Sequence, residues 1–206
     1  MSYWKTLNVS RETLEELEEY KESLLLWNRK INLISEKSSK NIWGRHLLDS
    51  AQIFKYLTAS DRNILDMGSG GGLPGLVLGL VAKKKYPNLK VTLVESDRRK
   101  CVFLKEVVRA HKLNSVVLSE RVELLPAQTS DVVTARAMAP LKTLLDYASP
   151  HLSDGGICVF LKGVNYKKEI DEALAFWRFN ISVDASITNV GSAVLKITDL
   201  EHKNGV

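Results

Sequence analysis

The chain of 206 residues is long enough for one substantial domain with a helical extension, and short for two full domains. Its 45% hydrophobic and 26% charged residues are typical of a globular protein, and it has no uninterrupted apolar run of roughly 20 residues, which a membrane span needs. The net charge of +5 is compatible with a polyanionic partner but does not identify one.

The N-terminal segment is expected to be helical. Apolar residues recur at close to helical spacing from Ser10 to Ile34, and Ser10 followed by acidic residues is typical of a helix start. A second helical stretch is expected at about 39–57. The start of the chain lacks the apolar core of a signal peptide, so we expect a cytoplasmic protein. We expect residues 1–60 to form a helical extension and residues 61–206 the main domain.

From residue 63 onward, short apolar runs alternate with amphipathic segments. The runs predict strands at 64–67, 91–94, 116–118, 132–135 and 157–161, with helices near 75–84, 98–112, 141–148 and 166–176. Two further strands, at about 180–187 and 193–198, follow each other directly and are expected to pair antiparallel at an edge. The order predicts an α/β fold with a doubly wound, mostly parallel seven-stranded sheet.

The two cysteines, Cys101 and Cys158, belong to no CxxC or Cys/His cluster. This spacing predicts neither a disulfide nor a metal site, and it fits a reducing compartment. Both side chains are expected to pack as small apolar groups.

A glycine-rich loop, Asp66–Gly75, follows the first strand and leads directly into a helix. Ligands of such sheets bind at the carboxyl ends of the strands, where this loop lies. The Gly-Lys-Ser/Thr ending of a Walker phosphate loop is absent. Gly70, Gly72 and Gly75 formally match G-x-G-x-x-G, so an NAD-dependent oxidoreductase is one alternative.

Acidic residues at two strand ends favour S-adenosylmethionine (AdoMet) over a dinucleotide. Asp66 would meet a pyrophosphate unfavourably but suits the ammonium group of AdoMet. Its placement near that group, directly or through water, is a hypothesis. Glu95 ends the second strand, where an acid hydrogen-bonds ribose hydroxyls for either ligand. After the third strand, Val122 is placed to pack on an adenine ring, and Glu123 or a backbone group to read its edge.

With these residues assembled, the chain resembles the bacterial 16S ribosomal RNA guanine-N7 methyltransferases known as RsmG, also GidB. The resemblance covers about residues 20–200. One mild departure is Gly71, which stands where proline is common. The motifs that carry the resemblance are W-N-x-x-x-N-L-x-S at 27–35, R-H-x-x-D-S at 45–50, the loop D-M-G-S-G-G-G-L-P-G at 66–75, and the triplets R-V-E at 121–123, A-R-A at 135–137 and L-K-G at 161–163.

The resemblance implies a class I AdoMet-dependent methyltransferase with a Rossmann-like sheet. It implies that the substrate is a guanosine of 16S ribosomal RNA, at position 527 in the decoding-region loop, presented by naked RNA, a precursor particle or the small subunit. We expect a monomer. The expected AdoMet-binding residues are Asp66, Gly68, Gly70, Gly72, Leu73, Glu95, Val122, Glu123 and Arg136.

Guanine N7 carries a lone pair and no proton, so we expect catalysis by alignment without a general base. Arg136 ends the fourth strand and is the candidate catalytic residue; it can hold the cofactor carboxylate, a phosphate or guanine O6, and a structural ion pair is the alternative. Arg45, His46 and Lys162 are candidates for RNA contact. His46 and Asp49 lie three residues apart on a predicted helix, so capping or bracing is equally open.

Other functions remain open from the sequence. The same cofactor loop serves methyltransferases of another RNA or of a small molecule, although the basic charge and the N-terminal motifs argue against the latter. A nucleotide-binding module without catalysis is a further alternative, distinguishable by binding without turnover.

Overall fold

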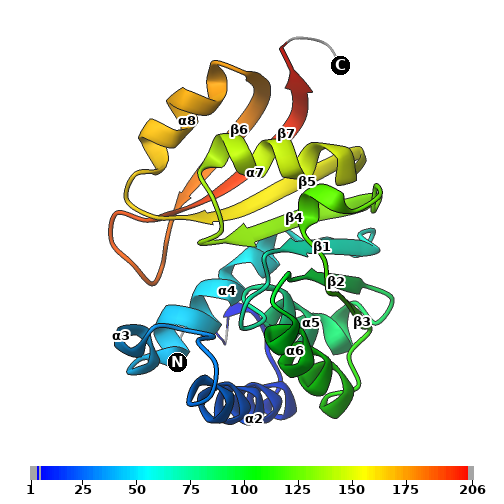
Figure 1. The fold of residues 1–206 in the computed structure, drawn as a ribbon, viewed down its shortest axis with the longest axis vertical. Helices are drawn as coiled ribbons and strands as arrows, with labels where there is room; N and C mark the ends of the chain where they lie inside the picture. Colours follow the sequence, from blue (N-terminus) through cyan, green and yellow to red (C-terminus); the bar gives the residue numbers. More distant parts are fainter. Residues whose placement is uncertain (1–3, 5, 204–206) are drawn as a thin grey trace.

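The computed structural model of the chain describes residue 4 and residues 6–203. Seven strands form one sheet in the order β3-β2-β1-β4-β5-β7-β6, and β1 to β5 pair in parallel (Figure 1). β7 is antiparallel to both β5 and β6, so the sheet ends in the predicted antiparallel pair. The strands are β1 (Asn63–Met67), β2 (Lys90–Val94), β3 (Ser115–Leu118), β4 (Ser130–Arg136), β5 (Leu152–Lys162), β6 (Trp177–Ala185) and β7 (Ala193–His202).

Both faces of the sheet are buried at its centre, in β1 and β4, as the continuous apolar runs predict. Along β1, Ile64 and Leu65 are both fully buried, but they belong to two separate hydrophobic clusters. Successive side chains of a strand point to opposite faces, so each run supplies both clusters. The helices α5 (Gly75–Lys85) and α6 (Arg98–Ala110) cover one face, and α7 (Leu141–Ala148) and α8 (Tyr166–Leu174) cover the other (Figure 1).

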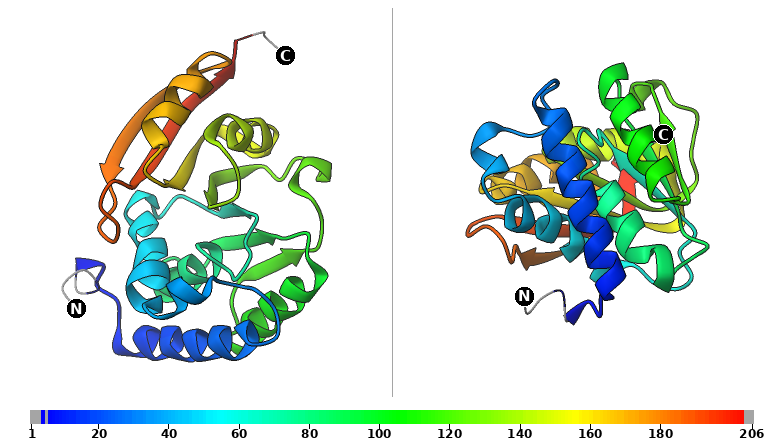
Figure 2. Two further views of the ribbon diagram at one scale, coloured as in Figure 1. Left: turned by 60° about the vertical axis from the view of Figure 1, so that its left-hand side comes forward. Right: turned by 90° about the horizontal axis from the view of Figure 1, so that it is seen from below.

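The first long helix, α2 (Arg11–Asn28), packs beneath α5 and α6 (Figure 2). The Ser10 hydroxyl accepts a hydrogen bond from the Thr13 N–H at 3.3 Å, the predicted helix start. The helix ends earlier than the apolar spacing up to Ile34 predicted. The Asn28 side chain accepts hydrogen bonds from the N–H groups of Leu33 and Ile34, at 2.8 and 2.9 Å, and these hold the chain in a turn.

The second helical stretch is present, but it is built from short pieces of different pitch. They are α3 (Glu36–Ser39), the π-helical η1 (Trp43–Leu48), α4 (Asp49–Ala51) and the 3₁₀ segment η2 (Gln52–Tyr56). π-Helical turns of this kind occur frequently at functional sites.

Both cysteines are free and buried, as predicted. Among the described residues, no helix is long and apolar enough to cross a membrane.

Candidate functional site

Two hollows lie at the carboxyl edge of the sheet. The first, which we call the loop cleft, has a volume of about 360 Å³ and follows the ends of β1, β2, β3 and β4; its lining includes Gly68, Glu95, Glu120, Val122, Glu123, Met138 and Ala139. The second, the polar hollow, is also about 360 Å³; its lining includes Arg45, His46, Asp49, Arg136, Ala137, Lys162, Ser186, Thr188, Asn189 and Ser192. Because Ala137 lines one and Met138 the other, the segment after β4 separates two neighbouring sites.

The glycine-rich loop owes its shape to backbone conformations that favour glycine. Gly68 and Gly72 have φ of +65° and +87°, in the left-handed region. A Cβ on Gly68 would lie 2.9 Å from Met138 Cγ, and one on Gly72 would lie 2.2 Å from Leu76 Cδ1. Both glycines are therefore required by close packing as well as by φ.

Asp66 holds the glycine-rich loop from the buried interior of the protein. Its side chain is fully buried, and its carboxylate accepts hydrogen bonds from the Gly75 N–H and the Thr134 hydroxyl, both at 3.1 Å. Burial raises the pKa of this carboxyl from 3.8 to about 6, although the hydrogen bonds oppose the shift. In the structure Asp66 braces the loop and does not line the cleft, so its contact with a cofactor stays a prediction.

Glu95 lies in the loop cleft with its carboxylate held in place. One oxygen accepts from the Gly70 N–H at 2.9 Å and the other from the Asp97 N–H at 2.8 Å. The residue is only 8% exposed. Since a carboxylate offers about four lone-pair sites, these two hydrogen bonds leave acceptor capacity toward the cleft.

The remaining cofactor candidates divide into two groups. Val122 is buried and Glu123 exposed, at the start of η3 (Val122–Leu124), and both line the loop cleft near Gly68 and Glu95. Leu73 is 4% exposed and packs in the hydrophobic core. Like Leu73, Gly70 and Gly72 shape the loop without lining the cleft.

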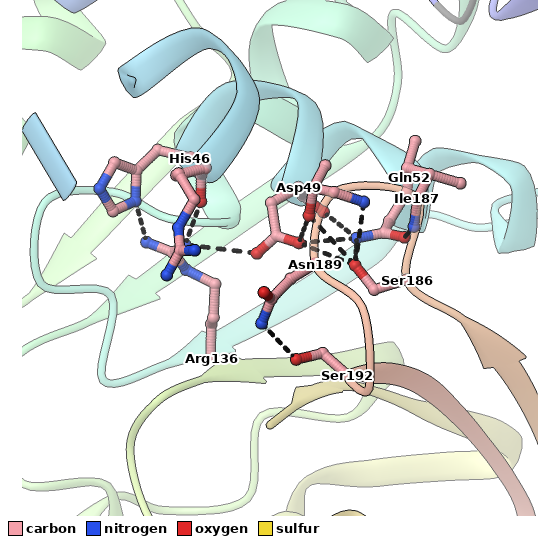
Figure 3. A network of polar contacts seen from close by, with 10 residues as sticks. His46, Asp49, Gln52, Arg136, Ser186, Ile187, Asn189 and Ser192 are labelled. Atoms are coloured by element: carbon pink, nitrogen blue, oxygen red, sulfur yellow. Dashed lines mark hydrogen bonds and ion pairs between the residues drawn. The ribbon is translucent and has the colours of Figure 1, made fainter. Parts of the chain in front are cut away.

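Arg136, at the end of β4, contacts the helical extension (Figure 3). Its guanidinium donates to the Arg45 carbonyl at 3.1 Å, lies 2.8 Å from His46 Nδ1, and forms an ion pair with Asp49 at 3.4 Å. The structural ion pair that the sequence left as an alternative is thus present. A guanidinium has five donors, and it remains in the wall of the polar hollow.

The His46 ring is neutral and accepts a hydrogen bond from the Arg136 guanidinium. A guanidinium only donates, so Nδ1 accepts and the ring proton is on Nε2. Burial, followed by the charges of Arg136 and Arg45, lowers the pKa of His46 to about 4. The His46 side chain is therefore committed to Arg136, whereas Arg45 is exposed and its side chain is available to a ligand.

The sequence did not single out the loop between β6 and β7, residues 186–192. Asp49 accepts hydrogen bonds from Thr188 Oγ1 at 2.6 Å, from Ser186 Oγ at 3.4 Å and from Gln52 Nε2 at 2.8 Å (Figure 3). The same carboxylate holds Arg136 and this distant loop, so Asp49 joins the two walls of the polar hollow. The signal in the sequence was a mostly polar segment from 186 to 192, interrupted by Ile187 and Val190, which resembles an ordinary turn.

Lys162 has a different environment from the one predicted. Its side chain is 8% exposed; Nζ donates to the Ala139 carbonyl at 2.8 Å and forms an ion pair with Glu169 at 2.5 Å. Glu169 also accepts the N–H of Leu141. The ammonium joins β5, α8 and the segment that lines the loop cleft, and Lys162 also lines the polar hollow, so its contact with an RNA phosphate stays a prediction.

Comparisons with known proteins agree on one family and one fold. Residues 13–198 match the family model described as rRNA small subunit methyltransferase G. The chain is 46% identical over 195 residues to the ribosomal RNA small subunit methyltransferase G of Ruegeria sp. strain TM1040, which covers 95% of each protein.

Solved structures with low sequence identity share the fold. The M. jannaschii protein TYW2 in complex with AdoMet matches with a TM-score of 0.57, 14% identity and 80% coverage of each chain. A SAM-dependent methyltransferase from Aquifex aeolicus matches with a TM-score of 0.56 and 15% identity, over 75% of this chain and 90% of that one. The sheet is thus that of the class I AdoMet-dependent methyltransferases.

Proposed function

The chain belongs to the rRNA small subunit methyltransferase G family, and from this premise we propose that it transfers a methyl group from AdoMet to N7 of a guanosine in 16S ribosomal RNA. The observation that carries the proposal is the pair of neighbouring hollows at the carboxyl edge of the sheet. The loop cleft would take the cofactor and the polar hollow the base, with residues 137–139 between them. The oxidoreductase alternative is set aside, because the family is one of methyltransferases.

The loop cleft fits AdoMet in size and in chemistry. Its volume is within the range of small-molecule sites. Glu95, fixed by two backbone N–H groups, is placed to accept from ribose hydroxyls, and Gly68 lines the same cleft. Val122 would pack on the adenine ring, with Glu123 beside it. When bound, AdoMet supplies an electrophilic methyl group on a positively charged sulfur.

The polar hollow would position the guanine and would not supply a general base. Guanine N7 has no proton to lose, so the reaction does not need a proton acceptor. His46, with its pKa lowered to about 4, stays neutral and serves to hold Arg136. The Arg136 guanidinium would lie toward guanine O6, the neighbour of N7 on the same edge of the base. Rate enhancement would come from alignment of the base with the cofactor cleft.

Exposed basic residues near the polar hollow suit an RNA backbone. Lys37, Lys40 and Arg45 are exposed on the segment whose Ser38 lines the hollow, and Lys167 and Lys168 are exposed at the start of α8. Such contacts predict binding that weakens strongly with salt.

We extend the proposal to the organisation and setting of the protein. Residues 1–60 would be the helical extension and residues 61–206 the methyltransferase domain. The protein would act as a cytoplasmic monomer on 16S ribosomal RNA, either alone or within a small-subunit particle or its precursor.

The test is methyl transfer from labelled AdoMet to 16S ribosomal RNA that lacks the modification, both naked and in particles, followed by mapping of the label. Label at N7 of a single guanosine in the decoding-region loop supports the proposal and identifies the better substrate. Label on another RNA, or on small molecules only, would contradict the substrate. Cofactor binding without any turnover would favour a binding module.

A further inference from the structure

The loop at 186–192 lies on the opposite side of the polar hollow from the loop cleft. In the sheet order, the loop cleft follows the ends of β3, β2, β1 and β4, and the hollow continues over β5 and the start of β7. The loop joins β6 to β7 at this same edge, so it closes the hollow at its far end. A base that presents one edge to the cofactor must therefore present the opposite edge to this loop.

For guanine, the two edges differ in their hydrogen-bonding groups. N7 and O6 share one edge and are both acceptors, whereas the exocyclic 2-amino group is a donor on the opposite edge. If N7 faces the loop cleft, the 2-amino group faces the loop, which needs an acceptor there to recognise guanine.

Asn189 has the free acceptor. Its side chain points from the loop toward Arg136 (Figure 3). Its Nδ2 donates to Ser192 Oγ at 2.6 Å, and no donor among the described residues reaches its carbonyl oxygen. The hydroxyls of Ser186 and Thr188 are held by Asp49, at 3.4 and 2.6 Å.

The loop is held firmly enough to act as a preformed wall. Besides the hydrogen bonds to Asp49, the Ile187 N–H donates to Gln52 Oε1 at 3.3 Å, and the Ser186 N–H donates to the Ser192 carbonyl at 2.9 Å. Asp49 also binds Arg136, so the wall that would face guanine O6 and the wall that would face the 2-amino group share one anchor. Preorganisation of this kind reduces the entropy lost on binding.

We propose that Asn189 is a specificity-determining residue of the polar hollow, whose carbonyl oxygen accepts a hydrogen bond from the 2-amino group of the target guanine. This inference rests on the proposed function and adds the group that distinguishes guanine from a purine without that amine. A flipped-out base in a single-stranded loop exposes this edge for such a contact.

The experiment compares unmodified 16S ribosomal RNA carrying guanosine or inosine at the methylated position. Inosine retains N7 and O6 but lacks the 2-amino group. For the unaltered protein, kcat/KM should fall about 10-fold with inosine, the effect of one hydrogen bond of about 1.4 kcal/mol. In Asn189→Ala, kcat/KM for guanosine should fall by about the same factor, and the two RNAs should react equally.

Two variants separate recognition from loop structure. Ser192→Ala removes the partner of Asn189 Nδ2 but leaves the carbonyl, and Asn189→Asp keeps an acceptor; both should retain the preference for guanosine. Dissociation constants for AdoMet should be unchanged in all three variants.

An undiminished guanosine preference in Asn189→Ala would overturn the inference, as would its loss in Ser192→Ala. If the unaltered protein labels neither RNA, the proposed function itself fails. If it labels guanosine and inosine equally, only the role of Asn189 fails.

Discussion

The buried carboxyl of Asp66 makes the stability of the protein depend on pH. Its pKa is raised from 3.8 to about 6, so the folded state binds a proton more tightly than the unfolded state does. Between these pKa values stability therefore falls as pH rises. The whole shift corresponds to about 3 kcal/mol, at roughly 1.4 kcal/mol per pKa unit. About 2 kcal/mol of this loss should occur between pH 4 and pH 7.

Asp66→Asn removes the ionisation and preserves the shape. The amide oxygen can accept from the Gly75 N–H, and its NH₂ can donate to the Thr134 hydroxyl once that hydroxyl rotates. We expect the variant to be more stable than the unaltered protein at pH 7, by up to about 3 kcal/mol, and about equal to it near pH 4. Asp66→Ala leaves both donors unsatisfied in the interior, and it should be destabilised at every pH by about 2 kcal/mol or more.

The assay is urea unfolding followed by circular dichroism at half-unit steps from pH 4 to pH 8. We compare the unfolding free energies of Asp66→Asn and the unaltered protein at each pH. In their difference, the contributions of all titratable groups common to both proteins cancel. A difference that grows through pH 4–6 and then levels off is the expected result. A difference that is constant with pH would refute the argument that burial governs this carboxyl.

The other predictions concern the loop and the two cations at strand ends. Gly70→Val should abolish AdoMet binding in calorimetry; a Cβ there meets only a carbonyl oxygen at 3.8 Å, but the φ of +55° strains a branched residue, so some loss of stability should accompany the loss of binding. Undiminished binding would exclude this placement of the loop. Gly72→Ala should instead lower stability, measured by urea unfolding, by about 3 kcal/mol, since overpacking and a positive φ act together. Arg136→Ala should slow labelled methyl transfer at least about 100-fold, and an unchanged rate would remove it from the site. Lys162→Ala leaves Glu169 without its buried partner and should cost about 3 kcal/mol in unfolding free energy; a loss of RNA affinity at full stability would instead support the predicted phosphate contact.

The fold was readable from the sequence because its signals are local. Runs such as 64–67 and 132–135 are apolar except at Asp66 and Thr134, and such nearly continuous runs are typical of strands buried on both faces. The absence of a helix between the last two strands likewise predicted their antiparallel pairing. The end of α2 was missed because apolar spacing continues beyond Asn28, whereas the turn depends on one side chain that bonds two backbone N–H groups.

The candidate site was only partly readable, because its contacts join segments far apart in the chain. Sequence position placed Arg136 and Lys162 at strand ends, where a free cation would face a ligand. Their partners, Asp49 and Glu169, lie on helices, and no spacing rule relates the members of each pair. The importance of the loop at 186–192 became visible only when Asp49 was seen to bind it.

The measurement that tests the central claim most directly compares labelled methyl transfer to two forms of unmodified 16S ribosomal RNA. One carries guanosine at the mapped position and the other 7-deazaguanosine, in which a C–H replaces N7 and the rest of the base is kept. We predict label on that base in the first RNA and none in the second. Equal label in both would contradict methylation at N7, and no label in either would contradict a role in ribosomal RNA methylation.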